Sequence, residues 1–125
     1  MNVPADRRYT DQHEWGLVED GKVRIGITDY AQDALGDVVF VDLPEVDTPV
    51  QAGAMVAEVE STKSLAEVYA PITGTIIRVN SALTSKPELI NQDPYGEGWF
   101  IVIDPDDPRA VESLLDAEAY QKLIA

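Results

Sequence analysis

The sequence has 125 residues, 45% of them hydrophobic, which suits one folded domain with a core of its own. It has no cysteine and one histidine, which excludes disulfide frameworks, thiolate zinc sites and multi-histidine metal sites. The formal charge of −14 disfavours binding to nucleic acid and suits encounters with basic protein surfaces.

A β-hairpin is predicted between Glu14 and Ile27. Apolar side chains occupy every second position from Val23 to Ile27, which is the period of a half-buried strand. The Asp20-Gly21 pair is a strong two-residue turn signal. Glu14 to Glu19 is therefore expected to form the strand before the turn.

A short helix near residues 28–35 is predicted next. Thr28 can act as its N-cap, and Gly36 suits the position just after its last turn. The run from Val38 to Leu43 is apolar and rich in β-branched residues, and it ends at Pro44. This composition predicts another strand.

Three strands are predicted in a central hairpin region that covers about residues 54–79. They are Met55 to Glu60, Leu65 to Ala70 and Thr75 to Val79, and turn signals separate them. Short strands at regular spacing are typical of β-sandwiches and flattened barrels. We therefore expect a mainly β fold of this kind, formed by residues 1–125 as a single domain.

The last part of the chain is predicted to contain a loop, one strand and a C-terminal helical segment. Prolines and glycines mark the loop over residues 80–98, and Trp99 to Asp104 reads as the strand. The helical segment covers about residues 107–124, with Asp107-Pro108 and Asp116 as helix starts. The side chains expected to pack on the sheet are Val111, Leu114, Leu115, Tyr120, Leu123 and Ile124.

Lys63 stands at the predicted tip of the central hairpin. If the turn is centred on Thr62 and Lys63, then Val59 faces Ala66, and small or apolar side chains match across the strands. The β-branched Thr62 is poorly suited to a type I′ turn, which favours a type I turn or a wider loop. The lysine amine is then exposed to water, although a lone lysine at a hairpin tip is most often plain surface.

The same register places acidic residues opposite each other. Glu58 faces Glu67, with Glu60 close by, and like charges opposed in this way destabilise a sheet by up to about 1 kcal/mol. One interpretation is that a partner protein recognises this acidic face. The alternative is that the side chains extend into solvent at little cost.

The sequence lacks the motifs of common enzymes. It contains neither a GxSxG nucleophile motif nor a phosphate-binding GxxxxGK[ST] loop. His13 has no spacing that singles out a catalytic triad, and a lone histidine is more often structural. We therefore expect no catalytic residues and a protein that is not an enzyme.

Several segments together closely resemble the glycine cleavage H-protein family. The segment VESTKS, from Val59 to Ser64, is followed by VYAP from Val68 and by Gly74, and it is similar to the family's lipoylation hairpin. GITDYAQDALGDVVFV, from Gly26, and NQDPYGEGW, from Asn91, are similar to further family motifs. The resemblance covers nearly the whole chain in order, and these motifs together are highly specific.

The resemblance implies a hybrid β-sandwich like that of lipoyl domains, with lipoic acid attached through an amide to Lys63. It implies a shuttle in the glycine cleavage system with three partner enzymes. A pyridoxal-phosphate glycine decarboxylase loads an aminomethyl group, an aminomethyltransferase passes the one-carbon unit on, and dihydrolipoamide dehydrogenase reoxidises the dithiol. A lipoyl ligase or transferase attaches the cofactor. The chemistry then belongs to the cofactor and the partners.

The resemblance also implies roles for further residues. Glu14 and Glu67 match positions of a surface cleft that receives the loaded arm, although an aspartate is common at the second position. The expected recognition residues for the ligase and partners are Glu58, Glu60, Ser61, Thr62 and Ser64. Many relatives have valine where this chain has Thr62.

Other functions are weighed against this one. An H-like protein could act mainly as a lipoyl or octanoyl donor in lipoate relay, and this also needs Lys63. A biotinyl domain would have methionines beside the lysine, and a plain interaction module would not need the lysine. Residues 1–9 lack the apolar stretch of a secretory signal, and no apolar run reaches the roughly 20 residues of a membrane span. We expect a cytoplasmic monomer with neither membrane nor nucleic-acid partners.

Overall fold

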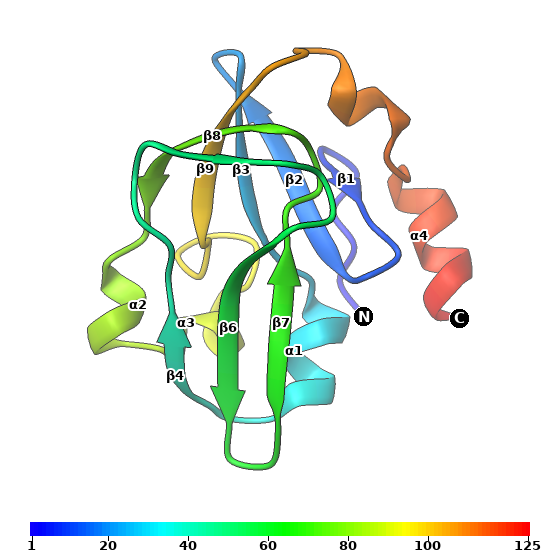
Figure 1. Ribbon diagram of the computed structural model, residues 1–125. Coiled ribbons are helices and arrows are strands. Elements are labelled where there is room, and N and C mark those ends of the chain that lie inside the picture. Colours follow the sequence, from blue (N-terminus) through cyan, green and yellow to red (C-terminus); the bar gives the residue numbers. More distant parts are fainter.

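The computed structural model describes all residues from Met1 to Ala125 and contains two antiparallel sheets (Figure 1). The strand orders are β1-β2-β3-β9-β8-β5 in the larger sheet and β4-β6-β7 in the smaller. Their bounds are β1 Arg8–Tyr9, β2 Glu14–Glu19, β3 Lys22–Ile27, β4 Val38–Asp42, β5 Thr48–Val50, β6 Met55–Ser61, β7 Leu65–Tyr69, β8 Gly74–Val79 and β9 Ile101–Pro105. The predicted mainly β fold is confirmed as a sandwich, because the two sheets do not close into a barrel.

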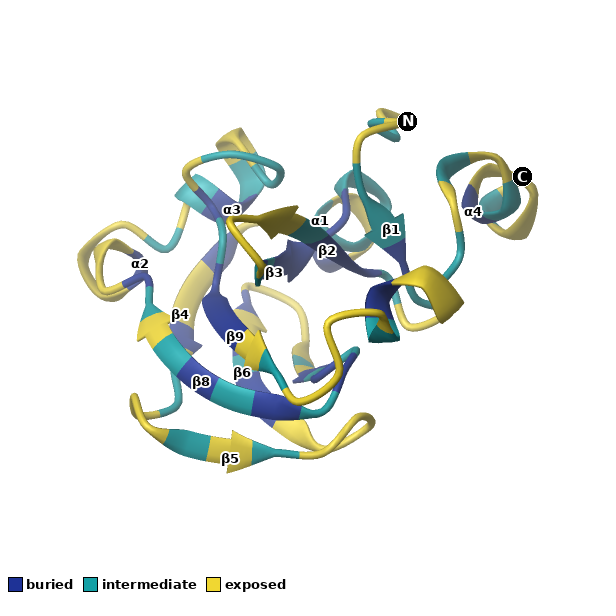
Figure 2. Ribbon diagram, turned by 90° about the horizontal axis from the view of Figure 1, so that it is seen from above, coloured by how far each residue is buried: buried dark blue, intermediate teal, exposed yellow.

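The main core contains 19 buried residues, which come from both sheets, the short helices and the loops between them. Val23 and Ile25 of β3 belong to it, as do Val59 of β6 and Val68 of β7. Figure 2 shows buried positions running along the central strands, while the outermost strand β5 has no buried residue. Each fully buried aliphatic side chain of this kind stabilises the fold by about 1.5–3 kcal/mol.

Four short α-helices and one 3-10 helix surround the sheets. Their bounds are α1 Asp29–Leu35, α2 Ala82–Ser85, α3 Leu89–Gln92, η1 Ala110–Ser113 and α4 Ala117–Ile124. Helix α1 confirms the helix predicted near residues 28–35: Oγ1 of Thr28 accepts a hydrogen bond from the amide of Ala31 at 3.2 Å. Gly36 ends the helix with φ of +82°, a conformation that suits glycine.

The C-terminal helical segment predicted over about residues 107–124 contains two helices, η1 and α4, with an extended stretch between them. Leu115 lies in this stretch, where it exchanges two backbone hydrogen bonds with Tyr9 of β1. Asp116 caps α4 as predicted, with its Oδ1 accepting from the amide of Ala119 at 2.8 Å. Tyr120 is buried, but Leu123 is 45% exposed and does not pack into the core as expected.

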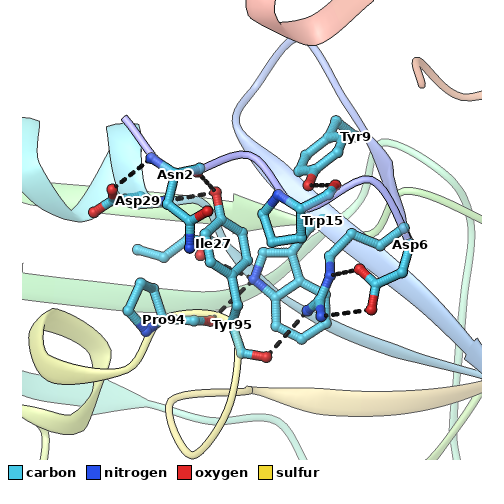
Figure 3. Close-up of polar contacts among 10 residues, drawn as sticks. Asn2, Asp6, Tyr9, Trp15, Ile27, Asp29, Pro94 and Tyr95 are labelled. Atoms are coloured by element: carbon cyan, nitrogen blue, oxygen red, sulfur yellow. Dashed lines mark hydrogen bonds and ion pairs between the residues drawn. The ribbon is translucent and has the colours of Figure 1, made fainter. Parts of the chain in front are cut away.

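The N-terminal residues are fastened to the sandwich by polar contacts (Figure 3). The amide of Asn2 donates to Oδ2 of Asp29 at 3.0 Å, and the Tyr95 hydroxyl donates to the carbonyl of Asn2 at 2.7 Å. The guanidinium of Arg7 lies 4.7 Å from the ring centre of buried Trp15. These contacts hold β2 and the start of α1 together, and both elements border the site described next.

Candidate functional site

The hairpin of β6 and β7 has the predicted register. Val59 pairs with Ala66, and Glu58 pairs with Glu67. Neither residue of the turn, Thr62 or Lys63, has a positive φ, so the turn is not type I′, as the sequence indicated. The register places Lys63 at the exposed end of the hairpin (Figure 1).

Ser61 organises the turn from its base, where its side chain is buried. Its Oγ accepts hydrogen bonds from the amides of Lys63 at 3.3 Å and Ser64 at 3.0 Å. The backbone amide of Ser61 also donates to the carbonyl of Ser64 at 2.8 Å. A hydroxyl at this position therefore fixes the backbone from which the Lys63 side chain projects.

The turn between α1 and β4 lies beside the hairpin tip. The amide of Thr62 donates to the carbonyl of Asp37 at 3.0 Å. The Lys63 stem passes over Gly36, where an added Cβ would lie 3.3 Å from Cε of the lysine. The absence of a side chain at Gly36 thus leaves room for the lysine stem.

Asn91 of α3 holds this turn in place. Its Nδ2 donates to the carbonyl of Gly36 at 2.8 Å and to Oε1 of Gln32 at 3.0 Å. Its Oδ1 accepts from the amide of Val38 at 2.9 Å. A single amide side chain therefore joins the end of α1 to the start of β4.

A groove of about 300 Å³ begins beside the hairpin tip and contains both predicted cleft residues, Glu14 and Glu67. Its lining is mostly apolar, and α1 and β7 contribute more than half of the residues. The lining residues are Gln12, His13, Glu14, Ile27, Tyr30, Ala31, Ala34, Leu35, Val59, Ser64, Ala66, Glu67 and Val68. A larger hollow of about 720 Å³ shares Gln12 and Glu14 with the groove but has no residue of the hairpin tip.

Glu14 is a buried carboxylate, only 2% exposed. Its Oε1 accepts from the hydroxyl of Thr10 at 2.6 Å, and its Oε2 accepts from the amide of Tyr69 at 3.3 Å. Burial raises the pKa of Glu14 above its ordinary value, against the opposite effect of these two hydrogen bonds. No cation pairs with it, so it can receive a positively charged group in the groove.

Glu67 lies on the exposed side of β7. Its Oε2 accepts from the Tyr69 hydroxyl at 2.8 Å. Asp42, Glu58 and Glu67 are register partners across β4, β6 and β7, so three carboxylates stand in one row. None of the three forms an ion pair. The structure thus places Glu67 both at the groove and in an acidic row.

His13 forms the outer wall of the groove together with Tyr30, and their ring centres are 4.7 Å apart. Nδ1 of His13 lies 2.8 Å from the Tyr120 hydroxyl, which lies 2.7 Å from Oγ1 of Thr28. Burial lowers the pKa of His13 and raises the pKa of Tyr120 to about 12. His13 therefore joins the groove wall to α4. This is a structural role, which is the commoner role of a lone histidine.

Comparison with known proteins decides the family. The family model described as "Glycine cleavage H-protein" matches residues 7–125. The chain belongs to the glycine cleavage H-protein family. The glycine cleavage system H protein of Thermus thermophilus is 56% identical over 124 residues, which cover 99% of this chain and 97% of the relative. That of Geobacillus kaustophilus is 52% identical over 124 residues, 99% of this chain and 98% of the relative.

A solved structure gives the same assignment. The crystal structure of a glycine cleavage system H protein from Mycobacterium marinum matches with a TM-score of 0.88 and 46% identity. The match covers 96% of this chain and 97% of that one. The resemblance to the H-protein family and the lipoyl-domain-like sandwich expected from it are therefore confirmed.

Several residues around the site were not singled out as functional from the sequence. Gly36, Asn91, Tyr30 and the amide of Tyr69 contribute to the site but lie far apart in the chain. Apart from the predicted helix end at Gly36, their only signal was that they fall within the H-protein motifs. The structure contains no group of three acidic or histidine side chains placed to hold a metal ion, and no helix long and apolar enough to cross a membrane.

Proposed function

We propose that this chain is the lipoyl-carrying shuttle of a glycine cleavage system, with lipoic acid attached to Lys63. Residues 1–125 act as one carrier domain, in which the hairpin of about residues 54–79 presents the arm. The observation that carries the proposal is an exposed, unpaired lysine at a hairpin tip beside an apolar groove. Membership of the H-protein family supports the same role.

The residues around Lys63 fit a lipoyl group. The amine is free for acylation, since it forms no ion pair or hydrogen bond within the protein. The groove begins at Ser64, the residue after Lys63, and its apolar wall suits a hydrocarbon chain and sulfur atoms. When bound, the lipoyl group supplies a disulfide that can accept a one-carbon unit and be reduced to a dithiol. The C-terminal segment of about residues 107–124 pairs with β1 through Leu115 and contacts His13 of the groove through Tyr120.

Glu14 gives the groove its specificity for an amine. A primary ammonium group on the cargo would find a carboxylate already ordered by Thr10 and the Tyr69 amide. The interaction also keeps the cargo amine protonated, because an opposite charge favours the charged form. The apolar walls from α1 and β7 keep bulk water away from this end. Glu67 stands nearer to solvent and is proposed to assist at the groove entrance.

The partners would be glycine decarboxylase, aminomethyltransferase and dihydrolipoamide dehydrogenase, with a lipoyl ligase or transferase for the modification. Tethering raises the local concentration of the arm at each partner, so the carrier needs no catalytic residues. Glu58 and Glu60 are proposed to face the ligase and partners, because they lie on the outer face of β6. Ser61, Thr62 and Ser64 are proposed to fix the shape of the tip.

Reconstitution tests this proposal. The lipoylated wild-type protein should support glycine decarboxylation and one-carbon transfer when the three partner enzymes are supplied. The Lys63→Arg variant keeps the charge but cannot be lipoylated, so it should support neither reaction. Efficient transfer of the acyl group to another acceptor, without any glycine turnover, would instead favour lipoate relay.

A further inference from the structure

Lys63 is the only cation in a long stretch of the chain. From Ile25 to Ile77 the sequence has nine aspartates and glutamates and no other lysine or arginine. Three of these acids form the row across β4, β6 and β7, and Glu60 lies next to this row on the side of the tip. The sheet that carries the hairpin is therefore anionic, with a single positive charge at its end.

The charges on this sheet are not neutralised within the protein. Neither Lys63 nor the carboxylates of Asp42, Glu58, Glu60 and Glu67 take part in an ion pair. The lysine is exposed, and its aliphatic stem lies against Gly36 rather than beside an acidic side chain. A protein that approaches the tip therefore meets both the negative row and the positive amine directly.

Most of the other cations gather elsewhere. Arg7, Arg8 and Arg109 line a hollow of about 420 Å³, and Lys22, Arg24 and Arg78 line another of about 230 Å³. No residue of the β6–β7 hairpin belongs to either hollow. In Figure 1 the β2–β3 turn lies at the top of the molecule and the hairpin tip lies at the bottom. Both hollows also contain acids, and four of their six cations form ion pairs, whereas the acids in the row beside Lys63 form none.

We propose that acylation of Lys63 is itself a charge switch, by which a basic docking surface on a partner enzyme prefers the modified carrier. This inference rests on the proposed function. The Nζ–carbonyl bond forms as an activated acyl donor, such as an acyl adenylate, loses its leaving group. The ammonium gives up two protons and becomes a neutral amide. The formal charge changes from −14 to −15, and the anionic sheet loses its only positive charge.

The partner that fits this surface has lysine or arginine side chains around the entrance to its active site. In the unmodified carrier these would be repelled by the amine at the tip, whereas the amide removes the repulsion. One unit charge at roughly 6 Å from a partner's cation in water changes an affinity by about threefold. Salt should weaken the effect, because both groups are exposed.

The switch can be tested without lipoic acid. Unlipoylated wild-type protein, Lys63→Gln, Lys63→Arg and Lys122→Gln are compared in binding to glycine decarboxylase by isothermal titration calorimetry, at about 20 mM and about 300 mM salt. Lys63→Gln mimics the charge of the amide without the arm, and Lys63→Arg keeps the positive charge. Lys122→Gln makes the same change in net charge on α4, where the lysine pairs with Glu118 at 3.5 Å.

The proposal predicts that Lys63→Gln binds about threefold more tightly than wild type at low salt, and that the difference largely disappears at high salt. Lys63→Arg and Lys122→Gln should bind like wild type. Equal affinities of Lys63→Gln and Lys63→Arg at low salt would overturn the proposal, as would an equal gain in Lys122→Gln or no binding of any form. Glycine turnover with lipoylated wild type, measured alongside, tests the proposed function separately.

Discussion

The side chain of Lys63 rests on Gly36, a residue that comes 27 positions earlier in the chain. A Cβ at Gly36 would lie 3.3 Å from Cε and 3.8 Å from Cδ of the lysine. The lysine stem thus packs against the turn between α1 and β4, and the hydrogen bonds of Asn91 hold this turn in place. The groove beside this turn is lined by α1 and includes Glu14, so we propose that the contact directs a lipoyl arm on Lys63 toward Glu14.

Replacement of Gly36 by alanine should affect both folding and lipoylation. The positive φ of +82° strains any other residue, at a cost of about 1–3 kcal/mol in the free energy of unfolding. The added methyl group would also displace the lysine stem, so the rate of lipoylation by a ligase should fall. Urea denaturation measures the first effect and a mass-spectrometric time course measures the second.

Gly21→Ala provides the matched control. Gly21 has φ of +76° but nothing within 4 Å of an added Cβ. It should lose about 1–2 kcal/mol of stability while its rate of lipoylation stays unchanged. Lipoylation of Gly36→Ala at the wild-type rate would show that the contact with Lys63 is unimportant.

Lys63→Arg should fold like the wild-type protein. The exposed tip contributes little packing, so the free energy of unfolding should change by no more than about 0.5 kcal/mol. Thermal denaturation followed by circular dichroism checks this. A drop in Tm of many degrees would mean that the lysine is a structural residue, contrary to its exposed position.

Reversal of charge on the outer face of β6 should slow recognition. In the variant Glu58→Lys plus Glu60→Lys, lipoylation or partner turnover should fall by severalfold, and more strongly at low salt, because exposed charges are screened by ions. The control is Glu112→Lys plus Glu118→Lys, which makes the same change in net charge at exposed positions of the C-terminal segment. Unchanged rates at low ionic strength would remove the proposed recognition role.

Glu14→Gln should change how stability depends on pH. Burial raises the pKa of Glu14, so the folded protein binds this proton more tightly than the unfolded chain. The resulting stabilisation is present at low pH and is lost as pH rises through the folded-state pKa. Glutamine does not titrate, so the free energy of unfolding of Glu14→Gln relative to wild type should increase as the pH rises above the ordinary pKa of a glutamate and through the raised pKa of Glu14. Parallel pH profiles for the two proteins would contradict this account of Glu14.

The same variant tests the proposed amine contact. Loss of the negative charge should shorten the lifetime of the loaded carrier, measured as release of ammonia from the isolated protein. Thr10→Val removes one hydrogen bond to the carboxylate but leaves its charge, and it should have a smaller effect. An equal lifetime in Glu14→Gln and wild type would show that the carboxylate does not hold the cargo.

The hairpin register could be predicted because the two strands are adjacent in sequence. The small and apolar side chains of Val59 and Ala66 leave few other pairings that keep one face buried. The helix near residues 28–35 was equally predictable, because Thr28 caps its start with a local hydrogen bond and Gly36 readily adopts the positive φ at its end. Local chemistry determines both features.

Elements that depend on distant partners could not be predicted in the same way. The spacing of Val111, Leu114 and Leu115 imitates a helix, but Leu115 pairs with Tyr9 as an isolated bridge. Strand β5 contains Pro49, which argues against a strand except at a sheet edge, and β5 is an edge strand. The groove likewise joins Glu14 to the amide of Tyr69, 55 residues later. Only the folded chain brings these groups together.

The most direct test of the central claim is the intact mass of the protein after incubation with lipoate, ATP and a lipoyl ligase. The account predicts that wild-type protein gains the mass of one lipoyl group and that Lys63→Arg gains none. A wild-type protein that stays unmodified under conditions where a known acceptor is fully lipoylated, or a Lys63→Arg variant that is modified equally well, would contradict it.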